Sequence, residues 1–236
     1  MKYMGSKNRI AKHILPIMLA EAEKNNITTW VEPFVGGGNM IDKVPESYTR
    51  IGYDLNPHTI AAMLGIRDFV EQLPNSVSEE EYRSLKGTDS HPINSWVRYG
   101  GSFGGKFDNG YARSKDSKGN DRNHVNEARR NALKQSPKIQ SVEFICKSYK
   151  DVKVENALIY CDPPYQGTSG YKTGAFLHSE FFQWCRDMKS KGNIVFISEY
   201  NAPSDFEVVW QGEIKTNFSS QRKEATHNAT EKLFKV

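Results

Sequence analysis

The sequence has few cysteines and no pattern that would use them. Its 236 residues include Cys146, Cys161 and Cys185, which show no C-x-x-C spacing and, being three, cannot all pair. We therefore expect no disulfide framework, no zinc site and a reducing compartment, the cytoplasm. The six histidines are scattered without ligand spacing, so no metal is expected.

Long apolar runs are also lacking. No run approaches the roughly 20 residues that a membrane-spanning helix needs, and the first residues show no signal-peptide core, so no membrane partner is expected. Internal repeats and long low-complexity tracts are absent too. The length suits one domain with an insertion. We expect a monomer in solution.

Positive charge is modest in total but unevenly placed. The net charge is +4, yet residues 98–138 carry ten basic and four acidic residues. Aromatic residues are interleaved with these charges, a mixture that serves phosphate and base contacts together, although a solvated basic loop is the alternative. The residues expected to contact nucleic acid here are Arg98, Phe103, Lys106, Tyr111, Arg113, Arg129 and Arg130.

The shape of this basic stretch follows from its glycines. Residues 98–113 are glycine-rich and predict a hairpin or loop that could enter a groove of a duplex. Residues 123–134 predict a helix that presents Arg129 and Arg130 to phosphates. A later polar segment, 219–230, adds Arg222 as a further expected DNA contact.

A second feature is Asp162-Pro163-Pro164-Tyr165, which follows the short apolar run 157–161. That run predicts a buried parallel strand, and ligands bind at the carboxyl ends of such strands. The Asp162 carboxylate and the Pro163 carbonyl form a rigid acceptor cluster beside the Tyr165 ring. The cluster suits a planar substrate that carries an NH2 group. A plain N-cap and proline turn is the alternative.

A glycine turn and an acidic residue form the third feature. Residues 28–34 predict a strand, 35–39 contain three adjacent glycines beginning at Gly36, and the strand 50–53 ends at Asp54. Glycines allow close backbone approach to a ligand, and an acid after the second strand can bind ribose hydroxyls. The absence of G-x-G-x-x-G disfavours a nicotinamide cofactor. An ordinary βαβ unit with Asp54 as a helix cap is the alternative.

The remaining pattern completes an α/β fold. Further strands are predicted at 142–146, 193–198 and 232–236, and helices at 8–24, 57–73, 78–85 and 178–189. Residues 207–210 and 213–216, joined through Gln211-Gly212, predict an antiparallel hairpin. The glycine-rich segment 166–174 suits a loop that closes over a bound base, with a plain surface loop as the alternative.

The chain resembles the Dam-like family of DNA adenine N6-methyltransferases, in the class whose D-P-P-Y follows the recognition region. The resemblance covers nearly the whole chain. It rests on K-Y-M-G-S-K at 2–7, V-E-P-F-V-G-G-G-N at 31–39, Y-D-L-N at 53–56, S-Y-K-D at 148–151 and D-P-P-Y at 162–165.

The resemblance implies a Rossmann-like methyltransferase sheet with an inserted DNA-recognition region. Residues 1–56 and 141–236 would form the catalytic domain and 57–140 the insertion. The cofactor would be S-adenosylmethionine, contacted by Tyr3, Lys7, Phe34, Gly36, Asp54 and Asp162. The catalytic residues would be Asp162, Pro163 and Tyr165, the partner double-stranded DNA, and the setting a bacterial or phage-infected cell.

The mechanism expected from this resemblance is methyl transfer to a flipped-out adenine, whose amino hydrogens Asp162 and Pro163 would accept. An N4-cytosine DNA methyltransferase would use the same cofactor and a similar amino group. An RNA or protein-amide methyltransferase usually has Asn in place of Asp162. A catalytically silent DNA-binding protein would show a broken tetrapeptide or glycine turn. GATC is the family's suggestion for a target, and the sequence leaves open whether a restriction partner exists.

Overall fold

The structure is a computed structural model, and it describes residues 1–165, 176–215 and 228–236. The chain divides into two compact units, each built from two stretches of sequence. The first unit contains Met1–Lys12 and Phe34–Val152, and the second contains His13–Pro33 and Lys153–Val236.

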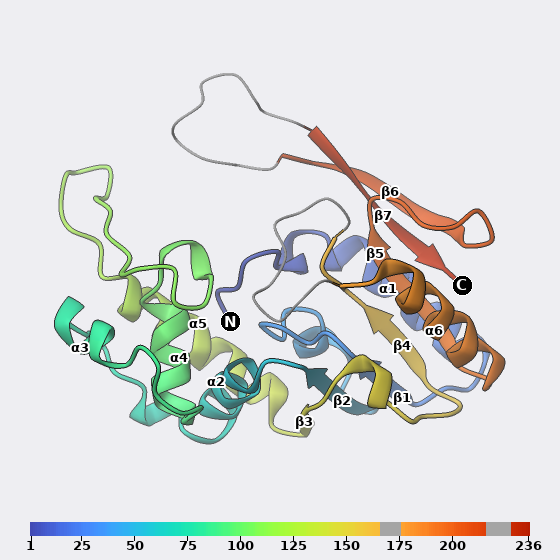
Figure 1. Ribbon diagram of the computed structural model, residues 1–236, viewed down its shortest axis with the longest axis horizontal. Coiled ribbons are helices and arrows are strands. Elements are labelled where there is room, and N and C mark those ends of the chain that lie inside the picture. The colour runs from blue at the N-terminus through green and yellow to red at the C-terminus, as the bar shows by residue number, and fades with distance from the viewer. Residues whose placement is uncertain (166–175, 216–227) are drawn as a thin grey trace. The chain divides into compact units, whose positions relative to one another are not determined.

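The first unit combines two parallel strands with a group of helices. The strands are β2 (Thr49–Asp54) and β3 (Val142–Cys146), in a register that places Asp54 opposite Cys146. The helices are α2 (Pro57–Asp68), α3 (Glu79–Ser84), α4 (Pro92–Gly100) and α5 (His124–Gln135). Figure 1 shows α2, α4 and α5 side by side, and α2 also packs on both strands.

The helices of this unit begin where the sequence supplies capping groups. Asn56 caps α2 by accepting a hydrogen bond from the His58 N–H at 3.0 Å, and Pro57 occupies the first helical position. Ser78 and Glu81 form a capping box at the start of α3, within the helix predicted at 78–85. Helix α5 begins after Asn123 and confirms the helix expected at 123–134.

The second unit is a mixed sheet with helices. Its strands are β1 (Thr29–Glu32), β4 (Leu158–Cys161), β5 (Ile194–Glu199), β6 (Glu207–Lys215) and β7 (Asn228–Lys235). Their order is β1-β4-β5-β7-β6; the first three are parallel, and β7 runs antiparallel to both of its neighbours. Helix α6 (His178–Ser190) packs on β5 (Figure 1). Helix α1 (Ala11–Lys24) lies in this unit from His13 onward.

The core of the second unit lies between the sheet and α6. All side chains of β4 are buried, in keeping with a parallel strand covered on both faces. Trp30, Phe181 and Phe196 are almost completely buried as well. The short apolar run therefore forms the strand that the sequence predicted. It ends one residue before Asp162.

The alternation of parallel strands with helices confirms the predicted α/β, Rossmann-like fold. The strands expected at 50–53, 142–146, 157–161 and 193–198 appear within a residue or two of their predicted bounds. The insertion expected at 57–140 stays a prediction. The compact units are divided elsewhere, since α2 to α5 share one unit with the glycine turn.

The hairpin predicted at 207–216 is wrong. Strand β6 runs through Gln211 and Gly212 without a turn, and its partner is β7. A Cβ on Gly212 would come within 2.6 Å of Cζ2 of Trp210, so the glycine makes room for the indole ring. The irregularity of the strand is a register shift between Val208 and Trp210. A glycine within a strand was mistaken for a turn.

The hairpin or loop expected at 98–113 needs a partial correction. Its first residues, Arg98 to Gly100, are the last turn of α4, a helix that was not predicted. The rest does fold back on itself, because Ser102 and Tyr111 form an antiparallel bridge.

Among the residues that the structure describes, no helix is long and apolar enough to cross a membrane.

Candidate functional site

The glycine turn of the first unit is hydrogen-bonded directly to the end of β2. The Val35 N–H donates to the carbonyl of Tyr53 at 2.8 Å, and the Gly36 N–H donates to Oδ2 of Asp54 at 3.1 Å. Gly36 has a φ of +49°, a left-handed conformation that favours glycine. The predicted association of glycine turn and acidic residue is therefore present.

Asp54 is a half-buried carboxylate with several donors. Its Oδ1 accepts a hydrogen bond from the Asn56 N–H at 2.9 Å, in addition to the bond from Gly36 to Oδ2. Burial raises the pKa of Asp54 to about 6, although the N–H groups of Asn56 and Gly36 and the Thr59 hydroxyl act in the opposite direction. A carboxylate has lone pairs for more than two donors, and burial leaves those of Asp54 with little water. Ribose hydroxyls are donors that could bind there.

Tyr3 forms an aromatic wall on the glycine turn. A Cβ on Gly36 would lie 2.9 Å from Cε1 of Tyr3, and one on Gly37 would lie 2.6 Å from its Cβ. The Tyr3 ring is 5.5 Å from that of Tyr99, whose hydroxyl is 2.8 Å from Oγ1 of Thr59. Only glycines at positions 36 and 37 allow Tyr3 to lie this close to the turn. The turn backbone, the Asp54 carboxylate and the Tyr3 ring together fit a nucleoside.

Two other predicted cofactor residues are Phe34 and Lys7. Phe34 directly precedes the glycine turn, is half-buried and has its ring 5.4 Å from that of Tyr149. Lys7 donates a hydrogen bond from Nζ to the carbonyl of Gly5 at 3.1 Å. The structure thus joins Tyr3, Gly36 and Asp54. Thr59 and Tyr99 were not predicted, because nothing in the local sequence marks them as neighbours of this turn.

In the second unit, Asp162-Pro163-Pro164-Tyr165 follows β4 directly. Pro163 is buried, while Asp162 and Tyr165 are half-buried. The Tyr165 hydroxyl donates to Oε1 of Glu231 at 2.6 Å, and its ring meets that of Tyr200 edge-on at 4.7 Å. Burial and the nearby carboxylates raise the pKa of Tyr165 well above its ordinary value, so the phenol keeps its proton.

Glu231 was missed from the sequence, as were two other residues near the tetrapeptide. His178 begins α6 and Glu199 ends β5, so each is far from 162–165 in the chain. Isolated His and Glu residues carry no local signal of such a role. The one hint is positional, because Glu199 follows a predicted strand in the same way that Asp54 and Asp162 do.

Two of the arginines expected to contact DNA are instead occupied within the first unit. Arg98 is 3% exposed; it donates from Nε to Oδ1 of Asp108 at 2.9 Å, and its guanidinium lies 4.2 Å from the Phe107 ring centre. Arg129 donates from Nε to the carbonyl of Leu73 at 2.8 Å. A guanidinium buried among such partners is not available to a phosphate, so the expectation for Arg98 is wrong. Little of Arg129 remains accessible.

The other expected DNA contacts lie at the surface. Phe103 is 61% exposed, and Lys106, Arg113 and Arg130 are exposed as well. Arg113 is ion-paired with Glu79. Tyr111 is half-buried and donates to the carbonyl of Val77 at 2.8 Å. Arg222 lies outside the described residues.

No candidate metal centre is found in the described part of the chain. Within residues 1–165, 176–215 and 228–236, no group of three or more His, Cys, Asp or Glu side chains could hold a metal ion.

The fold and these two groups of residues are those expected of a methyltransferase that uses S-adenosylmethionine. The sequence profile of the D12 class N6 adenine-specific DNA methyltransferases matches residues 3–90 and 105–225. The chain belongs to this family, which confirms the resemblance drawn from its motifs. The search of curated proteins found no match.

Several solved structures are similar to the chain. One is the rRNA methyltransferase aviRa from Streptomyces viridochromogenes, which is 11% identical and has a TM-score of 0.45. The alignment covers 97% of this chain and 84% of the aviRa chain. SMU.472 complexed with SAH is 11% identical with a TM-score of 0.34, covering 88% of this chain and 47% of its own. At this identity and these scores, neither likeness bears on the substrate.

Proposed function

We propose that this protein transfers a methyl group from S-adenosylmethionine to N6 of an adenine in double-stranded DNA. The observation that carries the proposal is the Asp162-Pro163-Pro164-Tyr165 cluster at the carboxyl end of β4, in a chain of the D12 family. The cluster offers a carboxylate, a carbonyl without a competing N–H, and an aromatic ring held by Glu231.

The chemistry required is activation of a weak nucleophile. S-adenosylmethionine would supply an electrophilic sulfonium methyl group and leave as S-adenosylhomocysteine, while the proton lost from the amino group would pass to the Asp162 carboxylate. The lone pair of the adenine amino group is delocalised into the ring, and the nitrogen attacks poorly in that form. Hydrogen bonds from its two hydrogens to the Asp162 carboxylate and the Pro163 carbonyl favour a tetrahedral nitrogen with an available lone pair. Since a paired base cannot reach such a cluster, the adenine is flipped out and stacks on Tyr165.

Most of the cofactor contacts are assigned to residues of the first unit. Asp54 accepts the ribose hydroxyls, and Tyr3 packs against the cofactor beside Gly36. The bond between the Gly36 N–H and Asp54 supports this assignment, because it fixes the carboxylate beside a turn that no larger residue can form. Phe34, Lys7 and Asp162 remain further cofactor contacts in the proposal.

The DNA contacts are assigned to the exposed basic and aromatic residues of the region 57–140. Phe103, within the fold-back closed by the Ser102 to Tyr111 bridge, and Arg113, two residues after it, are the candidates for base contact. Arg130 on α5 and Lys106 are the candidates for phosphate contact. Arg98 serves instead to hold this fold-back, through its bonds to Asp108.

The proposal is tested by expressing the protein in a host whose DNA carries no methylation and sequencing that DNA with modified-base detection. We expect N6-methyladenine at one short recognition sequence, which the experiment also identifies. N4-methylcytosine would show that the acceptor cluster binds the other amino base. Unmodified DNA from cells containing the folded protein would contradict the assignment of a DNA substrate.

A further inference from the structure

The two prolines of the tetrapeptide lack the N–H groups through which an extended chain usually bonds to a neighbouring strand. Pro163 and Pro164 have no N–H groups, so neither can donate a hydrogen bond to the neighbouring strand. That strand, β5, pairs Ile197 with Cys161 and continues for two more residues to Glu199. The two prolines themselves can therefore be held by hydrogen bonds only through their carbonyls.

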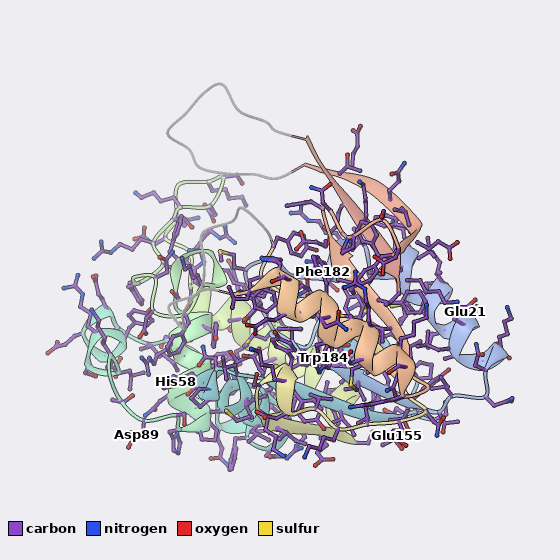
Figure 2. All side chains as sticks on the ribbon, turned by 45° about the vertical axis from the view of Figure 1, so that its right-hand side comes forward. Glu21, His58, Asp89, Glu155, Phe182 and Trp184 are labelled. Atoms are coloured by element: carbon purple, nitrogen blue, oxygen red, sulfur yellow. The ribbon has the colours of Figure 1, made fainter. Side chains whose placement is uncertain are left out.

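His178 supplies one such anchor. It is the first residue of α6, and its Nε2 lies 3.0 Å from the carbonyl oxygen of Pro164. Because a carbonyl can only accept, Nε2 carries a hydrogen and donates it. The imidazole is seated among aromatic rings, 5.0 Å from Phe176 and 6.2 Å from Phe182. Figure 2 shows Phe182 on the same helix.

Glu199 stands behind this histidine. Its side chain is fully buried, and its Oε2 lies 3.8 Å from Nε2 of His178, while its Oε1 accepts a hydrogen bond from the Tyr200 N–H at 2.8 Å. Its Oε2 is an acceptor on the N–H edge of the imidazole, a placement that favours the hydrogen on Nε2. Strand β5, helix α6 and the tetrapeptide are thereby connected through Glu199, His178 and Pro164.

We propose that His178, supported by Glu199, is a positioning residue for methyl transfer. Its hydrogen bond fixes the carbonyl of Pro164, and the stiff diproline transmits that orientation to the Pro163 carbonyl and to Asp162. The Tyr165 to Glu231 bond holds the next residue, so two successive residues are anchored. This inference rests on the proposed function, in which Asp162 and Pro163 accept the amino hydrogens.

Three variants separate positioning from folding. His178→Phe keeps a ring beside Phe176 and Phe182 but cannot donate, whereas His178→Gln restores an N–H donor of similar reach. Ser179→Ala, a neighbour on the same turn, is the matched control. We expect His178→Phe to lower kcat by about tenfold or more, with the Kd for S-adenosylhomocysteine and for DNA changed by less than about twofold. His178→Gln should recover most of kcat, and Ser179→Ala should resemble the parent.

A kcat for His178→Phe equal to that of the parent would overturn the proposal. So would equal losses in the Phe and Gln variants accompanied by a lower melting temperature, because that pattern belongs to a purely structural residue.

Nitrogen-15 NMR of labelled histidine gives a readout without any turnover. We expect hydrogen on Nε2 of His178, and faster exchange of that hydrogen in Glu199→Gln. Hydrogen on Nδ1 alone would overturn the proposal. If the parent protein makes no N6-methyladenine, the proposed function fails, while the NMR result still decides whether His178 holds Pro164.

Discussion

At the scale of single residues, two carboxylates stand at equivalent positions on different strands and are assigned different roles. Asp54 ends β2 and Asp162 follows β4, so both stand at the carboxyl ends of parallel strands. Asp54 is bonded to a glycine turn and suits hydroxyl donors. Asp162 precedes two prolines and suits an amino group. Their neighbours, rather than the residue type, set these roles.

Replacing Asp162 tests the second role. In Asp162→Ala the acceptor of one amino hydrogen is lost, so we expect the methylation rate to fall by about a hundredfold or more. DNA affinity should change little, because phosphate contacts are assigned to other residues. Single-turnover rates and DNA titrations measure both quantities. Near-normal turnover would show that the acceptor cluster is wrongly assigned.

The pKa of Asp54 leads to a prediction about cofactor affinity. Burial raises this pKa to about 6, above the value in the unfolded chain, so ionised Asp54 destabilises the free fold. This cost is absent below about pH 4 and is fully present above about pH 6. A ligand that donates hydroxyl hydrogens to the carboxylate favours its ionised form. Binding should therefore release protons near pH 6.

We expect the Kd for S-adenosylhomocysteine to rise by about fivefold to tenfold between pH 7.5 and pH 5. Calorimetry in buffers of different ionisation enthalpy measures both the affinity and the proton release. Asp54→Asn is the control, since it cannot ionise and should show a weak, flat profile. A parent profile equally flat would mean that Asp54 does not bind the ribose.

At the scale of elements, the fold-back of residues 102–111 is held by contacts of unequal strength. Arg98 is buried and bonded to Asp108, which is itself only 17% exposed. Arg113 is 69% exposed in its pair with Glu79. Ion pairs at the surface contribute little, whereas removal of one partner of a buried pair is strongly destabilising.

Arg98→Ala should therefore lower the free energy of unfolding by about 2 to 3 kcal/mol, somewhat less than a fully buried pair would lose. Arg113→Ala should lower it by less than about 1 kcal/mol. Urea denaturation of the two variants provides the comparison. Equal losses would contradict the structural role of Arg98.

The surface residues of this region are expected to divide between phosphate and base contact. Arg130→Ala should weaken binding to all sequences alike and flatten the dependence of log K on log salt by up to about one unit. Phe103→Ala should instead relax the target sequence, by about 1 to 3 kcal/mol at the affected base. Titrations of cognate and scrambled duplexes at several salt concentrations measure both effects. Loss of specificity in Arg130→Ala with an unchanged slope would reverse these roles.

The elements also show what the sequence could predict. Strands such as β4 and helices such as α5 follow from apolar runs, periodicity and capping residues, and these signals are local. Strand β6 was misread because Gly212 makes room for Trp210 within a sheet, a contact that a turn-residue rule cannot represent. Helix α4 was missed since glycines at its end resemble those of a loop.

The candidate site was predictable to the same extent. Gly36, Asp54 and Asp162 sit in short motifs that mark strand ends, so the sequence alone indicates them. His178 on α6 and Glu231 on β7 bond to the tetrapeptide, and Glu199 on β5 lies beside His178. Their roles depend on pairing between distant segments, which single residues do not announce. Arg98 was misjudged because positive charge in sequence does not distinguish a buried guanidinium from an exposed one.

At the scale of the whole molecule, this chain of the D12 family combines residues proposed to bind cofactor and DNA with residues proposed to activate the amino group. The first unit carries the glycine turn, Asp54 and the exposed basic residues, and the second carries the acceptor cluster. The central claim is that these groups methylate the amino nitrogen of adenine in DNA, with S-adenosylmethionine as the cofactor and no metal ion.

The most direct test is mass spectrometry of nucleosides from duplex DNA incubated with purified protein and S-adenosylmethionine in the presence of EDTA. An RNA duplex of the same sequence and the Asp162→Ala protein serve as controls. We predict N6-methyladenine in the DNA, with none in the RNA and none above background from the variant. Methylation confined to RNA, or DNA methylation that EDTA abolishes, would contradict this claim.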